Sequence, residues 1–248
     1  MRLTVTPRFA TTAVTILVCA VVAMVFVSFV TQAREYLAPG GIFLDVLSTF
    51  DRGAPGIPWL SVDEEQSIPA WFSSSALLLC AVLLVSVSSN PPARTSPLAW
   101  KILAVIFLFL SIDEAVGFHE KTVRPLRNAL GTDGILYSAW VIPAGILVVI
   151  LALAYARFAL ALPGRSRKLV ILAAVLFVGG ALVTELFGAA QVAASGQANL
   201  TYVIVSTTEE LMEMLGVVTF LYALMLLSAP EPHDQGGVEV IPSAATGL

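Results

Sequence analysis

The 248-residue chain has little charge, two cysteines and two histidines. Only 12% of its residues are charged, whereas 58% are hydrophobic, and the mean hydropathy is +0.90. A soluble domain of ordinary composition carries about 25% charged residues. The scarcity of charge therefore excludes an ordinary soluble domain and predicts a polytopic membrane protein.

Other absences limit the partners and the chemistry. The net charge is -4, and no basic run, face or arm is present to meet phosphates, so we expect no nucleic-acid partner. Cys19 and Cys80 both lie in apolar stretches, which favours packing over a disulfide or a metal pair. The chain also lacks a Gly-rich phosphate loop, a nucleophile elbow, a Cys-x-x-Cys pair and a His-box array.

Six apolar stretches are long enough to cross a membrane, which takes roughly 20 helical residues. The first stretch runs from Thr11 to Val30. It is longer than the roughly 7 to 15 apolar residues of a signal peptide, so we expect it to be retained. The predicted fold is an all-α transmembrane bundle over residues 1–228, with about six spans near 11–32, 69–89, 98–119, 135–161, 169–194 and 200–228.

Two segments are expected to lie outside the spans. Residues 33–68 mix turn formers, acids and aromatics, and are predicted to form the largest outer loop. Residues 229–248 have no apolar periodicity and are predicted to be a disordered tail. With the N-terminus inside, eight basic residues are cytoplasmic and five are outside, so we expect both termini in the cytoplasm and the chain in the cell (inner) membrane. The bilayer is then its main partner, and a homo-oligomer or a larger membrane complex stays open.

Three of the spans carry acids at similar depth. Asp113 and Glu185 lie roughly 22 and 24 Å from the cytoplasmic ends of their helices, at 1.5 Å per residue. In the sixth span, "YVIVSTTEELMEMLG", polar residues share an arc of roughly 120°. We expect Glu209 and Glu213 to face Glu185 and Asp113 rather than lipid. The arc comprises Tyr202, Ser206, Glu209, Glu210, Glu213 and Gly216.

The third span ends in "LSIDEAVGFHEK", which places four ionisable groups close together. On a regular helix Glu114 and His119 project to opposite flanks, so they meet Asp113 only if the helix frays before "KTVRP". The alternatives are that Glu114 bonds a neighbouring helix, that His119 lies at the membrane interface, and that Glu120 is solvated there.

No Lys or Arg is placed to neutralise these acids, and carboxylates that are close together cannot all ionise. Either most are protonated or bound cations supply positive charge. Carboxylates with an imidazole suit Fe, Mn or Zn, and we predict a site for one or two divalent ions, such as that of a membrane metalloenzyme. The alternatives are a proton- or cation-coupled transporter or channel that uses the carboxyls as a relay, and an accessory subunit whose acids join helices. The predicted ligands are Asp113, Glu114, His119, Glu185, Glu209, Glu210 and Glu213.

Three segments, "DEEQSIPAWFSS", "LSIDEAVGFHE" and "STTEELMEMLG", resemble stretches of a group of uncharacterised bacterial multi-span membrane proteins. The similarity covers roughly residues 31–228. It implies six helices and gives weight to these motifs, and it implies no activity.

Overall fold

The computed structural model describes residues 6–37 and 57–228. The predicted tail at 229–248 and residues 38–56 of the predicted outer loop lie outside the described residues.

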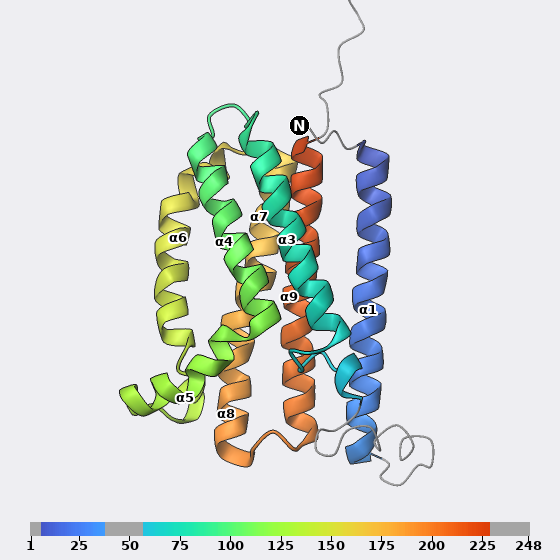
Figure 1. The fold of residues 1–248 in the computed structure, drawn as a ribbon, viewed down its shortest axis with the longest axis vertical. Helices are drawn as coiled ribbons and strands as arrows, with labels where there is room; N and C mark the ends of the chain where they lie inside the picture. Colours follow the sequence, from blue (N-terminus) through green and yellow to red (C-terminus); the bar gives the residue numbers. More distant parts are fainter. Residues whose placement is uncertain (1–5, 38–56, 229–248) are drawn as a thin grey trace, which may run out of the picture.

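The described chain is a bundle of long helices without a strand, which confirms the predicted all-α class (Figure 1). Short 3-10 helices, η1 and η2, lie in two connections, and η3 is a π-helical turn. The elements are α1 (Pro7–Leu37), η1 (Pro58–Leu60), α3 (Ile68–Ser88), α4 (Pro97–Val116), α5 (Phe118–Leu130), η2 (Gly134–Leu136), α6 (Val141–Ala161), α7 (Gly164–Val178), η3 (Gly179–Thr184), α8 (Glu185–Ser195) and α9 (Leu200–Ser228).

Among the described residues, five helices are long and apolar enough to cross a membrane, with α7, η3 and α8 forming one of them. The pair α4 and α5 makes a sixth candidate, bent by 81°. The predicted third span was wrong at its end, because α4 stops at Val116 and Gly117 adopts a left-handed φ of 63°. The predicted fourth span, 135–161, was wrong at its start, because α6 begins at Val141 and the 3-10 turn η2 precedes it.

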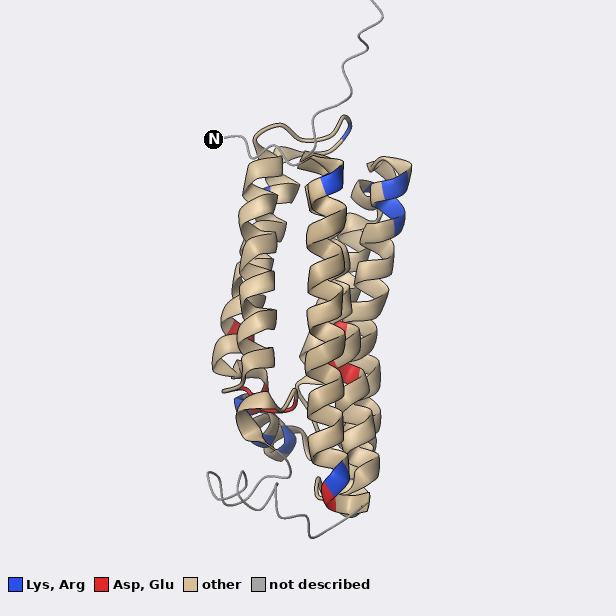
Figure 2. Ribbon diagram, turned by 90° about the vertical axis from the view of Figure 1, so that its right-hand side faces the viewer, with Lys and Arg blue, Asp and Glu red and all other residues tan. Residues whose placement is uncertain are grey.

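Both ends of the described helical bundle, the start of α1 and the finish of α9, lie on the same side in Figure 1. We call this side the terminal end and the opposite side the α5 end. Lys and Arg lie near the two ends, whereas acids also occur at mid-height (Figure 2). The terminal end holds Arg8, Arg94, Lys101, Arg157, Arg165, Arg167 and Lys168, and the α5 end holds Arg34, Lys121, Arg124 and Arg127.

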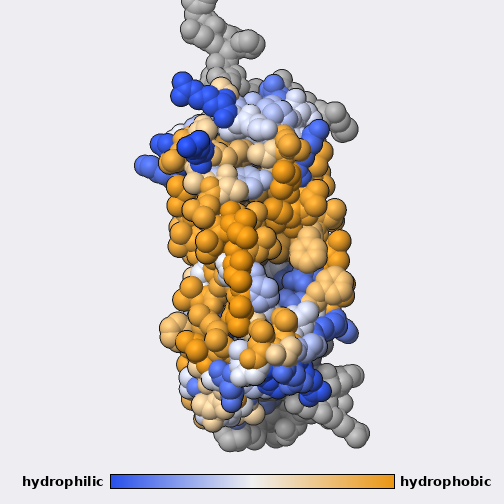
Figure 3. Space-filling model, turned by 90° about the vertical axis from the view of Figure 1, so that its left-hand side faces the viewer, coloured by the Kyte–Doolittle hydropathy of each residue, from blue (hydrophilic) through white to orange (hydrophobic). Residues whose placement is uncertain are grey.

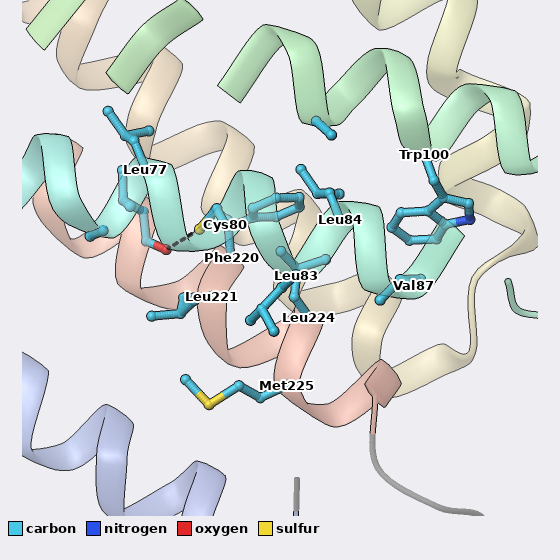
Figure 4. Packing of buried hydrophobic residues seen from close by; sticks show 14 of the residues in the cluster. Leu77, Cys80, Leu83, Leu84, Val87, Trp100, Phe220, Leu221, Leu224 and Met225 are labelled. Atoms are coloured by element: carbon cyan, nitrogen blue, oxygen red, sulfur yellow. Dashed lines mark hydrogen bonds between the residues drawn. The ribbon is translucent and has the colours of Figure 1, made fainter. Parts of the chain in front are cut away.

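The apolar core fills the terminal half of the bundle, where α3 packs on α4 and α9 (Figure 4). Phe107 stacks on Phe220 with ring centroids 4.6 Å apart. The Cys80 thiol is buried and lies 3.9 Å from the Val217 carbonyl oxygen. Cys80 is therefore a packing residue as predicted, whereas the same prediction was wrong for Cys19, which is exposed on α1.

The outside of the bundle is apolar over most of its height (Figure 3). Large side chains such as Leu153 and Val105 are exposed there. A surface of this kind is disfavoured in water and is suited to the hydrocarbon of a bilayer.

Candidate functional site: an acidic cavity between the helices

A cavity of about 980 Å³ lies between α4, α6, the α7–α8 helix and α9. Its walls differ between the two ends. Toward the terminal end they are apolar, and toward the α5 end they carry acids together with one histidine. These groups are Asp63, Asp113, Glu114, His119, Glu120, Glu185, Glu209, Glu210 and Glu213, so the cavity gathers all seven of the predicted ligands.

Helix α9 supplies the acids in the periodic pattern that the sequence predicts. All six residues of the predicted polar arc, from Tyr202 to Gly216, line the cavity. Met214 projects elsewhere and packs in a separate buried cluster with Val21 and Val25 of α1. Because each helical residue turns by about 100°, a single face can be polar while its neighbours pack against other helices.

Glu185 and Glu209 face each other beside Gly188. A methyl group at Gly188 would lie 3.8 Å from Glu185 Oε2 and 3.9 Å from Glu209 Oε2. The two carboxyl groups therefore approach each other from neighbouring helices. Carboxyl groups that lie close together resist ionising together, so a proton or a bound cation would relieve their repulsion.

The π-helical turn η3 comes directly before Glu185 and lies tightly against α9. A Cβ atom at Gly180 would be 2.8 Å from Glu213 Cγ and 2.9 Å from the Glu209 carbonyl oxygen. Only glycine therefore permits this approach. The wider turn changes which way the following residues face, and π-turns inside helices are frequent at functional sites.

The bend at Gly117 brings His119 back onto Asp113. His119 Nδ1 lies 2.8 Å from Asp113 Oδ2, and the His119 backbone N–H donates to Asp113 Oδ1 at 3.1 Å. On a regular helix the two would diverge, so the interruption of the helix is what joins them. Glu120, which a straight helix would stack over Asp113, is instead carried into α5.

The Glu65 carboxyl occupies the space where a side chain on residue 117 would lie. Its Oε1 atom is buried without a hydrogen-bond partner, and its Oε2 lies 4.0 Å from Lys121 Nζ. Glycine is thus required at position 117 for two reasons, the positive φ and the close contact with Glu65. This contact packs the loop before α3 against the bend between α4 and α5.

Asp63 belongs to the acidic cavity although no helical periodicity in the sequence singles it out. It precedes α3 and accepts a hydrogen bond from the Tyr202 hydroxyl at 3.1 Å. Burial raises its pKa to about 7, opposed by the Tyr202 hydrogen bond and reinforced by Glu120, Glu64 and Glu185. A residue in an irregular connection has no periodicity, so its neighbours could not be inferred.

We expect Asp63→Asn to change the pH dependence of stability. A carboxyl with a raised folded-state pKa binds more protons folded than unfolded between its ordinary value of 3.8 and about 7, so its contribution to stability falls as the pH rises through that window. The slope is at most about 1.4 kcal/mol per pH unit for one proton. Thermal melting from pH 4 to 8 should show wild type losing more stability than Asp63→Asn, and parallel curves would contradict the buried carboxyl.

No lysine or arginine is among the described residues that line the cavity. Eight carboxyl groups and one imidazole therefore share it without a fixed positive partner. In the described parts of the chain, no three His, Cys, Asp or Glu side chains are grouped closely enough to hold a metal ion as they stand. A bound ion would require these side chains to rotate toward it.

Helix length, apolar exterior and the cavity define the class as a helical bundle able to span a membrane. The chain belongs to a family described as a domain of unknown function (DUF8692), which matches residues 14–227. This membership fits the resemblance to uncharacterised proteins. No curated protein and no solved structure matches the chain.

Proposed function

We propose that the protein is inserted in a cell membrane with both termini in the cytoplasm and binds one or two divalent cations at the acidic end of its cavity. The orientation is supported by the distribution of basic residues, seven at the terminal end against four at the α5 end among those described. Cation binding is supported by eight carboxyl groups around a cavity whose described lining contains no Lys or Arg.

Glu185 and Glu209 are the leading bridging ligands, because their carboxyl groups approach each other from two helices. A cation placed between them would relieve the repulsion between the two carboxylates. His119 contributes Nε2, because Nδ1 is engaged with Asp113. Asp113 then orients the imidazole rather than binding the ion, as carboxylate partners of ligating histidines commonly do. Fe, Mn and Zn suit this set of oxygen and nitrogen ligands.

A proton relay is the second candidate, and two observations favour it. The carboxyl groups of Glu185 and Glu209 lie close enough to resist ionising together, which favours a proton held between them, and no group of three ligands is preformed in the described chain. In a relay the carboxyls exchange protons along the cavity and no metal is needed.

The test is thermal unfolding of the full-length protein in detergent, after chelation and then with Mn, Fe(II) or Zn. An ion at a hundred times its dissociation constant should stabilise the fold by about 2.7 kcal/mol. Glu213→Gln should reduce this shift, because it keeps the size of the side chain and removes its charge. Asp133→Asn is the matched control, because Asp133 is exposed and caps Gly134 N–H in a connecting turn.

Elemental analysis of the same samples shows whether stoichiometric metal is bound. Absence of bound metal, with no ion shifting the melting of wild type beyond that of Glu213→Gln, rejects the divalent site and leaves the relay.

A further inference from the structure

Beyond its acidic end, the cavity continues as an apolar arm toward the terminal end. Its lining residues on α6 extend from Ala144 to Ala159, a length of about 22 Å at 1.5 Å per residue. The cavity is far larger than an ion, since a water molecule accounts for only about 30 Å³ of liquid. The arm is bounded by side chains including Leu103, Phe107, Leu151, Ala152, Ala156 and Ala173.

Two contacts bound the region between α4 and α6. At the terminal end the Tyr155 hydroxyl of α6 donates to the Ala99 carbonyl oxygen of α4 at 2.9 Å. At the α5 end the ring of His119, which follows α4 in α5, lies 4.9 Å from the ring of Trp140, which comes directly before α6.

Between these contacts the cavity opens sideways. Val105 and Phe109 of α4 and Leu147 of α6 line the cavity, yet they are 66%, 58% and 55% exposed. Seen from this side, a hollow in the hydrophobic surface reveals hydrophilic residues (Figure 3). The opening lies at the height of the apolar belt, so a molecule could enter from the hydrocarbon of the bilayer.

We propose that the cavity takes a single-chain amphiphile with an ammonium head group from the membrane, with the chain in the apolar arm and the head among the carboxyls. The volume of about 980 Å³ is at the upper end of the roughly 300 to 1,000 Å³ typical of small-ligand sites, which favours one chain over a two-chain lipid. The charge of the acidic end selects the head group, because no Lys or Arg in the described lining could meet an anion.

This inference rests on the proposed function in one respect, that the acidic end binds cations. The two ligands are compatible in charge. Any carboxylate that the divalent ions leave unengaged still attracts an ammonium. A single-chain amphiphile with an ammonium head group is therefore the class of organic substrate that we assign to the same site.

The probe is octadecylamine carrying a photoreactive diazirine near the end of its chain, added to the full-length protein in detergent. We expect saturable labelling of α6 or α7 within the apolar arm, located by mass spectrometry of peptides. The corresponding alcohol and carboxylate should label at least tenfold less, because they lack the positive head group.

Ala152→Trp should reduce labelling at least tenfold, because its side chain fills the arm. Ala154→Trp is the matched control, since Ala154 is exposed on the same helix and is not among the cavity-lining residues. Ala156→Phe, one turn along the cavity wall, is a second blocking variant with a smaller side chain. Equal labelling of both blocking variants and wild type overturns the proposal, as does equal labelling by amine, alcohol and carboxylate.

Metal binding distinguishes this failure from failure of the proposed function. If wild type and Ala152→Trp both show a divalent-ion melting shift but the amine labels neither, the amphiphile is rejected and the ion site stands. If no ion shifts the melting but the amine labels the arm, and Glu213→Gln reduces that labelling, the ammonium site stands and the divalent ion is rejected.

Discussion

Gly117→Ala should destabilise the protein by about 2 to 5 kcal/mol and weaken cation binding. Two costs combine at this position. An alanine with a left-handed φ costs about 1 to 2 kcal/mol, and forcing a methyl group into an occupied site costs about 1 to 3 kcal/mol. The occupied site is that of the Glu65 carboxyl, which lies where the methyl group would be. Its displacement releases the loop that carries Asp63 and disturbs the bend that joins His119 to Asp113.

Gly131→Ala is the matched control for this substitution. Gly131 also follows a helix, has φ of 65°, and would have nothing within 4 Å of an added methyl group. Gly131→Ala should therefore destabilise the protein only by the cost of placing alanine at a left-handed φ, about 1 to 2 kcal/mol. Melting in detergent measures both losses, and titration with a divalent ion measures the effect on the site. Equal destabilisation by the two alanines would show that the Glu65 contact contributes nothing.

The regular helices of this site were predictable from sequence, and its interruptions were not. The polar arc of α9 follows from a fixed rotation per residue, so Glu209 and Glu213 could be assigned to the inner face before their neighbours were known. The depths of Asp113 and Glu185 follow from the fixed rise per residue in the same way.

The bend at Gly117 does not follow from regular helix geometry. A glycine within an apolar stretch is compatible with a continuous helix, and the sequence gives no sign that Glu65 lies against it. The meeting of His119 and Asp113 depends on this bend, and the position of Asp63 depends on an irregular connection. The lateral opening could not be predicted either, because it reflects the separation of α4 and α6 in the folded bundle rather than the character of any residue.

Glu185→Gln and Glu209→Gln should each weaken divalent-ion binding at least tenfold, and the double variant should weaken it little further. If one cation bridges both carboxylates, the first substitution already removes the bridge. The effects are then non-additive by about 1.4 kcal/mol or more, the free energy of a tenfold change. Independent ion sites on α8 and α9 would instead give additive losses.

The same double-mutant cycle has a second measurement without added metal. Each single substitution should raise the melting temperature in chelator, because it removes one member of a pair of neighbouring acids that repel each other when ionised. The second substitution should then add little, since the repulsion is already relieved. Asp133→Asn, on an exposed turn, should leave both measurements unchanged. If the cycle is additive in both ion binding and melting, Glu185 and Glu209 act separately and the bridged site is wrong. If it is non-additive in melting while no ion binds, the pair shares a proton, as the relay requires.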